Sequence, residues 1–81
     1  MTIQVLGAGC TKCQMLETSA IQALEETGIN AEIEKVTSMN KISEMGVLVT
    51  PALAIDGVVK SAGKVLTVKE MSRLLMDEAG I

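Results

Sequence analysis

Hydrophobic residues along the chain occur either in short runs typical of strands or at the three- and four-residue spacings typical of helices. The run at residues 3–6 ends at a glycine and predicts a buried strand. From Cys10 to Thr27 there is no glycine or proline, and apolar residues recur at helical spacing until Gly28, which predicts a helix with one apolar face. The residues expected on that face are Cys13, Leu16, Ala20, Ala23, Leu24 and Thr27.

The next two segments are shorter and more polar. In residues 31–36, Ile33 lies between Glu32 and Glu34, an alternation that favours an exposed edge strand. Residues 37–46 predict a second helix whose N-cap is Thr37 or Ser38. The residues expected on its buried side are Met39, Ile42 and Met45.

The C-terminal third contains two further strands and a helix. The apolar runs 52–55 and 58–60 are joined by Asp56-Gly57, the strongest short hairpin signal. Residues 61–64 are expected to form a loop, after which Thr67 and Glu70 have the spacing of a capping box. The last helix should continue through the apolar residues Val68, Met71, Leu74, Leu75 and Ala79 and end at Gly80.

These elements follow the order β-α-β-α-β-β-α. The first strand–helix–strand crossover implies parallel neighbours, and the hairpin adds an antiparallel strand. The prediction is an α/β fold with a four-stranded mixed sheet and three helices. A chain of 81 residues supports one domain, spanning residues 1–81.

Composition excludes several function classes. The chain has no aromatic residue and a net charge of -3, so it offers neither stacking platforms nor a basic face for nucleic acid. It has no histidine, the usual general base and the commonest metal ligand. The N-terminal residues do not resemble a signal peptide, and no apolar run is long enough to span a bilayer. We therefore expect a cytoplasmic monomer that binds neither membranes nor nucleic acid.

Two cysteines flank the start of the first predicted helix. Backbone N–H groups at a helix start carry partial positive charge, which stabilises a thiolate and lowers its pKa. Cys10 is therefore the candidate nucleophile, and Gly7 and Gly9 would leave its approach open. Cys13 lies one turn further along the same helix face, within reach of a disulfide, and is the candidate resolving thiol.

Lys12, the cysteine pair and the methionines each allow a second interpretation. Lys12 would lower the Cys10 pKa through its charge, but a lone lysine is equally often a solvated surface residue. A zinc site needs four ligands, and the chain supplies two cysteines and no histidine. The methionines at helical spacings are expected to fill the core, not to bind a soft metal. They are Met15, Met39, Met45, Met71 and Met76.

The only proline, Pro51, follows Thr50 at the start of a predicted strand. A trans proline that begins a strand is the commoner arrangement. A cis Thr50–Pro51 bond beside Cys10 would instead turn the Thr50 backbone outward, where an extended substrate segment could pair with it. The residues alone do not decide between the two.

Together these features resemble the thioredoxin superfamily, and more narrowly its short glutaredoxin-like "redox-active disulfide" members from archaea and bacteria. The resemblance covers nearly the whole chain and rests on four segments, at residues 7–13, 50–53, 55–57 and 62–64. It implies a thioredoxin-like fold and a thiol–disulfide oxidoreductase or electron carrier without a cofactor. It also implies that Cys10 is the nucleophile, Cys13 the resolving thiol and Pro51 a cis proline.

The resemblance further implies a substrate-binding surface and two kinds of partner. The surface around Cys10 would consist of Ala8, Gly9, Thr11, Thr50, Ala62 and Gly63. The partners would be a thioredoxin-reductase-like flavoprotein and client proteins that contain disulfides.

The sequence departs from ordinary thioredoxins at three places. Gly9 occupies the position before the first cysteine, where ordinary thioredoxins have tryptophan. Between the cysteines, Thr11-Lys12 replaces the Gly-Pro of ordinary thioredoxins. The first strand also lacks the buried aspartate that helps to deprotonate the resolving cysteine. Because the intervening residues help to set the redox poise, the reduction potential does not follow from the resemblance.

Two other functions fit a C-x-x-C motif. One is the binding of copper or another soft metal. Metal-binding modules of the heavy-metal-associated type place the motif after their first strand, but they follow a β-α-β-β-α-β order and usually have Met where this chain has Ala8. A non-catalytic adaptor on a redox fold is the other alternative, because a fold does not determine function.

Overall fold

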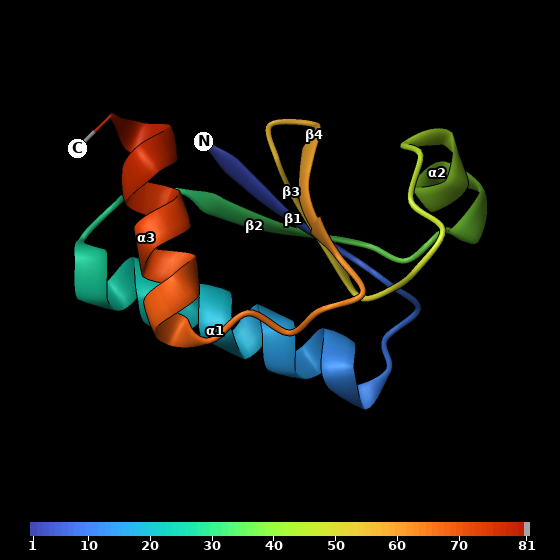
Figure 1. Ribbon diagram of the computed structural model, residues 1–81, viewed down its shortest axis with the longest axis horizontal. Coiled ribbons are helices and arrows are strands. Elements are labelled where there is room, and N and C mark those ends of the chain that lie inside the picture. The colour runs from blue at the N-terminus through green and yellow to red at the C-terminus, as the bar shows by residue number, and fades with distance from the viewer. Residues whose placement is uncertain (81) are drawn as a thin grey trace.

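The computed structural model describes residues 1–80 as a mixed sheet with helices on both of its faces (Figure 1). The predicted element order is confirmed. The elements are β1 (Thr2–Leu6), α1 (Thr11–Thr27), β2 (Glu32–Val36), α2 (Met39–Glu44), β3 (Ala52–Ile55), β4 (Val58–Ala62) and α3 (Val68–Ala79). None of these helices is both long enough and apolar enough to cross a membrane.

The strands form one sheet in the order β2-β1-β3-β4. Strand β1 pairs in parallel with β2 and antiparallel with β3, while β3 pairs antiparallel with β4. Strand β2 therefore lies at an edge, as its alternating glutamates predicted. Because β1 is central, the segment that follows it emerges from the middle of the sheet, and this segment carries the first cysteine.

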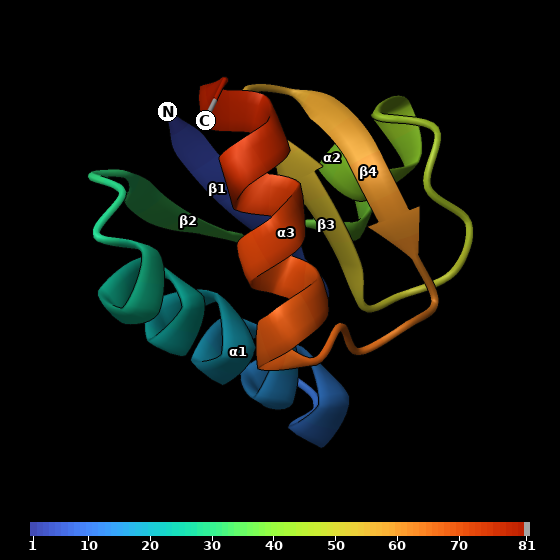
Figure 2. The same ribbon diagram turned by 60° about the vertical axis from the view of Figure 1, so that its left-hand side comes forward.

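Each face of the sheet has its own hydrophobic core, because successive side chains of a strand point to opposite faces. Helices α1 and α3 pack together on one face, and α2 covers part of the other (Figure 2). The core under α1 and α3 contains Ile3, Val5, Leu16, Ala20, Ala23, Leu53, Ile55, Leu66, Met71 and Leu75. The smaller core under α2 contains Leu6, Val36, Ile42, Val47, Ala52 and Ala54.

The hairpin between β3 and β4 turns at Asp56-Gly57, as predicted. Both residues have positive φ angles, 50° and 86°, which is the geometry of the turn that suits the right-handed twist of paired strands. The turn is also tied to the central strand. Asp56 accepts a hydrogen bond from the Thr2 backbone N–H at 2.8 Å, and Gln4 accepts one from the Gly57 N–H at 2.9 Å.

Two predicted boundaries were wrong. Strand β4 continues to Ala62, so Ser61 and Ala62 are paired with β3 and do not form a loop. The second helix covers only Met39–Glu44, with Ser38 as its N-cap. A helix of this length has room for one buried residue, Ile42, and Met39 is 55% exposed instead of buried.

The prediction that the methionines fill the core was also largely wrong. Met71 is buried and Met45 half-buried, but Met15, Met39 and Met76 are exposed. In α1 and α3 the buried face is already occupied by Leu16 and Leu75, each adjacent in sequence to an exposed methionine. Adjacent residues of a helix point about 100° apart, so these two methionines are turned away from the core.

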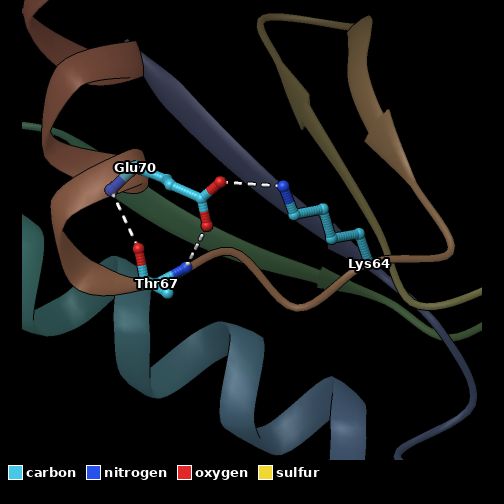
Figure 3. A network of polar contacts seen from close by, with 3 residues as sticks. All are labelled: Lys64, Thr67 and Glu70. Atoms are coloured by element: carbon cyan, nitrogen blue, oxygen red, sulfur yellow. Dashed lines mark hydrogen bonds and ion pairs between the residues drawn. The ribbon is translucent and has the colours of Figure 1, made fainter.

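A network of polar contacts at the start of α3 fixes the loop that precedes it (Figure 3). Thr67 accepts from the Glu70 N–H, and Glu70 accepts from the Thr67 N–H, which completes the predicted capping box. Lys64 forms an ion pair with the same carboxylate at 2.7 Å. These contacts lower the pKa of Glu70 from 4.5 to about 2, with the Lys64 hydrogen bond as the largest cause.

This network predicts an acid-dependent part of the stability. The folded-state pKa of Glu70 is depressed, so its contribution is fully present above about pH 4.5 and is lost as the pH falls toward 2. Glu70→Gln keeps the acceptor of the capping box but removes the charge. The free energy of unfolding, measured by urea titration, should differ most between wild type and Glu70→Gln near neutral pH, and the difference should shrink below pH 4.5. A difference independent of pH would contradict this assignment.

Candidate active site

Cys10 lies where the chain leaves the central strand and enters helix α1. It is the N-cap of α1, with an extended backbone at φ -70° and ψ 168°. Its side chain therefore faces the unpaired N–H groups of the first helical turn. The Cys13 N–H donates to the Cys10 sulfur over 3.4 Å, so the thiol takes the place that a serine or aspartate oxygen fills at other helix starts.

The second cysteine approaches the first from within the helix. Both cysteines are free thiols, and their Sγ atoms lie 2.7 Å apart. A disulfide bond is about 2 Å long, so the pair could close with a sulfur displacement of under about 1 Å. Cys10 is exposed, whereas Cys13 is only 5% exposed. The Cys10 sulfur is therefore accessible to another molecule, whereas the Cys13 sulfur is shielded.

The two thiols differ in acidity as they differ in exposure. Hydrogen bonds from the Cys13 side chain and backbone lower the pKa of Cys10, with the side-chain bond as the larger cause. Burial, followed by the hydrogen bond to Cys10, raises the pKa of Cys13. Lys12 lowers the Cys10 pKa through its backbone N–H, and its side chain is exposed. Of the two thiols, Cys10 therefore loses its proton first, while Cys13 retains its own.

Gly7 has a role that the sequence did not suggest. It was expected to leave the approach to Cys10 open, but it is buried and lies against Cys13 instead. A Cβ atom added at Gly7 would overlap the Cys13 Sγ and would lie 3.8 Å from the Thr50 Cβ. The absence of a side chain at the end of β1 therefore makes room for the inner sulfur. No motif marks this contact, because it joins a strand end to a helix.

The segment before β3 lies beside Gly7, the glycine that packs against the inner thiol. Thr50 is half-buried near Gly7, and its peptide bond to Pro51 is cis. The Pro51 carbonyl accepts a hydrogen bond from the Gly63 N–H at 2.8 Å, and a Cβ at Gly63 would be 2.8 Å from the Val49 side chain. The segment around Thr50 is thus held between the end of β1 and the end of β4.

The other residues of the predicted surface lie in the turn before Cys10, at the start of α1 and at the end of β4. Ala8 and Gly9 are exposed in the turn before Cys10, and Thr11 is the exposed first residue of α1. Gly9 has open space around it and a φ of 84°, so it leaves the outer thiol accessible. Ala62 is exposed and pairs with Ala52 in the sheet, directly before Gly63. Ala62 and Gly63 thus lie at the end of β4, on the side of the segment around Thr50.

A pocket of about 80 Å³ lies beside the inner thiol. Its lining includes Cys13 and, one turn further along α1, Glu17. Glu17 forms an ion pair with Lys35 of β2 at 3.3 Å. These two charged residues were not among those predicted from the sequence, although the four-residue spacing from Cys13 to Glu17 places both on one face of the helix.

Within residues 1–80, no group of three or more His, Cys, Asp or Glu side chains is arranged to hold a metal ion. The chain also follows β-α-β-α-β-β-α and not the β-α-β-β-α-β order of the heavy-metal-associated modules. The arrangement at the start of α1 is instead that of an acidic exposed thiol with a second thiol in contact behind it. It can attack a disulfide, hold a mixed disulfide and then release it.

Comparisons with known proteins agree with this chemistry. A family model described as "Thioredoxin domain" matches residues 1–76. A protein named thioredoxin from Methanothermobacter thermautotrophicus is 45% identical over 75 residues, which cover 93% of this chain and 97% of that protein. A thioredoxin from Methanocaldococcus jannaschii is 43% identical over 75 residues, covering 93% of this chain and 86% of the relative.

The contact between the sulfurs predicts how substitutions at Cys13 change the acidity of Cys10. Cys13→Ala removes the largest cause of the lowered pKa, so the pKa of Cys10 should rise. Cys13→Ser keeps a hydroxyl that can donate to the thiolate, so the rise should be smaller. The measurement is the rate of Cys10 alkylation by iodoacetamide as a function of pH. Equal pKa values in wild type and Cys13→Ala would show that the helix start alone sets the acidity.

The packing of Gly7 against Cys13 predicts the effect of one added methyl group. Gly7→Ala should displace the Cys13 sulfur, lower the free energy of unfolding by about 1–3 kcal/mol and raise the pKa of Cys10. Gly28→Ala, at the other end of α1, is the matched control. Its methyl meets open space, and its positive φ costs about 1–2 kcal/mol without touching either thiol. Urea unfolding and alkylation rates measure both effects; an unchanged Cys10 pKa in Gly7→Ala would contradict the contact.

Proposed function

The chain belongs to the thioredoxin domain family and is a protein disulfide oxidoreductase, and we propose that it reduces client disulfides through sequential reactions of Cys10 and Cys13. The observation that carries the proposal is the contact between two chemically unequal thiols. Their sulfur atoms lie 2.7 Å apart, the outer one exposed with a lowered pKa and the inner one buried with a raised pKa.

The first step is nucleophilic attack by the Cys10 thiolate on one sulfur of the client disulfide. The Cys10–client S–S bond forms, the client's own S–S bond breaks, and one client sulfur leaves as a thiolate that takes up a proton from solvent. The helix N-terminus and the Cys13 N–H stabilise the attacking thiolate before the reaction.

The second step releases the client. Cys13 loses its proton and attacks the Cys10 sulfur, which forms the Cys10–Cys13 disulfide and expels the second client sulfur. Two electrons pass from the dithiol to the client, which leaves with two thiols. The 2.7 Å separation supports this step, because it holds the reacting sulfurs together at a high effective concentration.

The residues around Cys10 provide a surface on which a client can lie. Ala8, Gly9 and Thr11 are exposed on one side of the nucleophile, and Ala62 and Gly63 are exposed at the end of β4. Their side chains are small, so a protein backbone can approach the thiol closely. We assign the Thr50 backbone to pairing with an extended segment of the client. Thr50 lies beside Gly7, which packs against the inner thiol, and the segment around Thr50 is held by the hydrogen bond between Pro51 and Gly63.

The oxidised pair must be reduced again for turnover. The proposed reductant is a thioredoxin-reductase-like flavoprotein, which would deliver two electrons by a second disulfide exchange at Cys10. The exposed side of Cys10 is the route open to both partners, so reductase and client would bind in turn. A non-catalytic adaptor with the same fold would not alternate between the reduced and the oxidised cysteine pair.

Blocking the second step tests this order of events. Cys13→Ser should accumulate a mixed disulfide on Cys10 with close to one client per protein, whereas wild type should show little adduct. The experiment incubates reduced protein with a disulfide-containing protein such as insulin and analyses it by non-reducing electrophoresis and mass spectrometry.

The matched control is Cys10→Ser, which keeps the buried thiol and removes the exposed one. It should form no comparable adduct, because Cys13 is 5% exposed and its pKa is raised. The absence of any adduct on Cys13→Ser with every disulfide substrate would sink the proposal. An adduct that forms mainly on Cys10→Ser would reverse the assigned roles.

A further inference from the structure

The buried thiol must lose a proton before it can act. Resolution of the mixed disulfide requires a thiolate at Cys13, yet burial and the neighbouring Cys10 raise the pKa of this group. Once Cys10 is bonded to the client, its sulfur no longer carries a negative charge that could receive the proton. The structure should therefore provide another acceptor close to the inner sulfur.

The pocket beside Cys13 has a carboxylate in its wall. Cys13 and Glu17 both line it, and they lie one helical turn apart on α1. Residues four apart on a helix lie on the same face, which accounts for the shared pocket wall. The pocket volume of about 80 Å³ is sufficient for more than one water molecule, and Gln14 and Thr37 add polar groups to its wall.

The Glu17 carboxylate is held in this position from the neighbouring strand. Lys35 on β2 binds it at 3.3 Å, and both residues line the pocket. The Glu17 side chain is 22% exposed, whereas that of Lys35 is 63% exposed. The Glu17 carboxylate therefore lies on the more buried side of the ion pair, and the Lys35 ammonium group lies on the solvent side.

We propose that Glu17 is the proton acceptor for Cys13 during release of the client, acting through water in the pocket it shares with that thiol. This inference rests on the function proposed above and assigns one further residue to its second step. The Cys13 S–H proton passes to the Glu17 carboxylate as the Cys13 sulfur attacks Cys10. The Cys10–client bond breaks, the client sulfur leaves with the electron pair, and Glu17 afterwards returns the proton to solvent or to that sulfur.

The other titratable groups around Cys13 do not replace this acceptor. Strand β1 contributes only Val5 to the pocket wall, followed by Gly7, and Cys10 at the start of α1 is consumed in the mixed disulfide. From β2 comes Lys35, which is cationic and binds Glu17. Among the residues that line this pocket, Glu17 is the sole carboxylate.

A simple electrostatic effect would have the opposite sign. A negative charge near a thiol opposes its ionisation, so removal of Glu17 would favour the Cys13 thiolate and accelerate release. Removal of a proton acceptor would slow release. The direction of the change in rate therefore separates these two roles, and the pH dependence of the second phase separates a proton acceptor from a residue that only supports the fold.

The test uses dithiobis(nitrobenzoate), a disulfide whose thiol product is coloured. Reduced protein mixed with this reagent should release one equivalent of thionitrobenzoate when Cys10 attacks and a second when Cys13 resolves the adduct. In Glu17→Gln the rate of the first phase should be unchanged, and that of the second should fall by about 100-fold, the lower end of the range for general acid–base catalysis. The second-phase rate of Glu17→Gln should also fall by about tenfold for each pH unit below the Cys13 pKa, whereas the second-phase rate of wild type should fall less steeply.

Two further variants complete the design. Glu25→Gln makes the same charge change at an exposed position of α1 outside the pocket and should release both equivalents at wild-type rates. Glu17→Asp keeps the carboxylate and should retain more of the second-phase rate than Glu17→Gln; it also tests the inference if Glu17→Gln does not fold, as judged by circular dichroism.

The outcomes are distinct. A second phase in Glu17→Gln that is as fast as or faster than in wild type overturns the role of Glu17, and so does equal slowing in Glu25→Gln. Failure of wild type to release a second equivalent would instead overturn the proposed function itself.

Discussion

The contact between the sulfurs of Cys10 and Cys13 depends on how the central strand ends. Strand β1 lies between β2 and β3, so the chain that follows it rises from the middle of the sheet directly into α1. Cys10 caps that helix and Cys13 lies in its first turn, with the sulfurs 2.7 Å apart. The inner sulfur lies where a side chain of Gly7 would otherwise be. Strand pairing, helix capping and one missing Cβ together determine the geometry of the pair.

This placement gives the two cysteines different acidity and different exposure. The helix start and the second thiol stabilise negative charge on Cys10, which solvent and partners can reach. Burial disfavours negative charge on Cys13 and raises its pKa, so the inner thiol holds its proton more strongly than the outer one. The protein thereby avoids two adjacent thiolates, which would repel each other. Lys12, whose charge was one candidate for tuning the pair, acts through its backbone N–H.

Local patterns predicted most of the fold because they rest on short-range physics. The three- and four-residue spacing of Cys13, Leu16 and Ala20 predicted the buried face of α1, and Asp56-Gly57 predicted the hairpin. The errors arose where contacts with another element of the fold decide how a residue is placed. Met15 and Met76 have helical spacing but point away from the core, and Ala62 joins β4 because Ala52 is available to pair with it.

The order of the elements, the position of the cysteine pair at a helix start and the resemblance to thioredoxins could all be predicted from the amino-acid sequence, since each depends on residues that are close along the chain. The groups that surround the inner thiol could not, because they come together only in the folded chain. Gly7 comes from the end of β1, Thr50 from the segment before β3, and Lys35 from the edge strand β2. Their contacts depend on strand order and on the crossing of the helix over the sheet, and neither spacing nor composition encodes these distances.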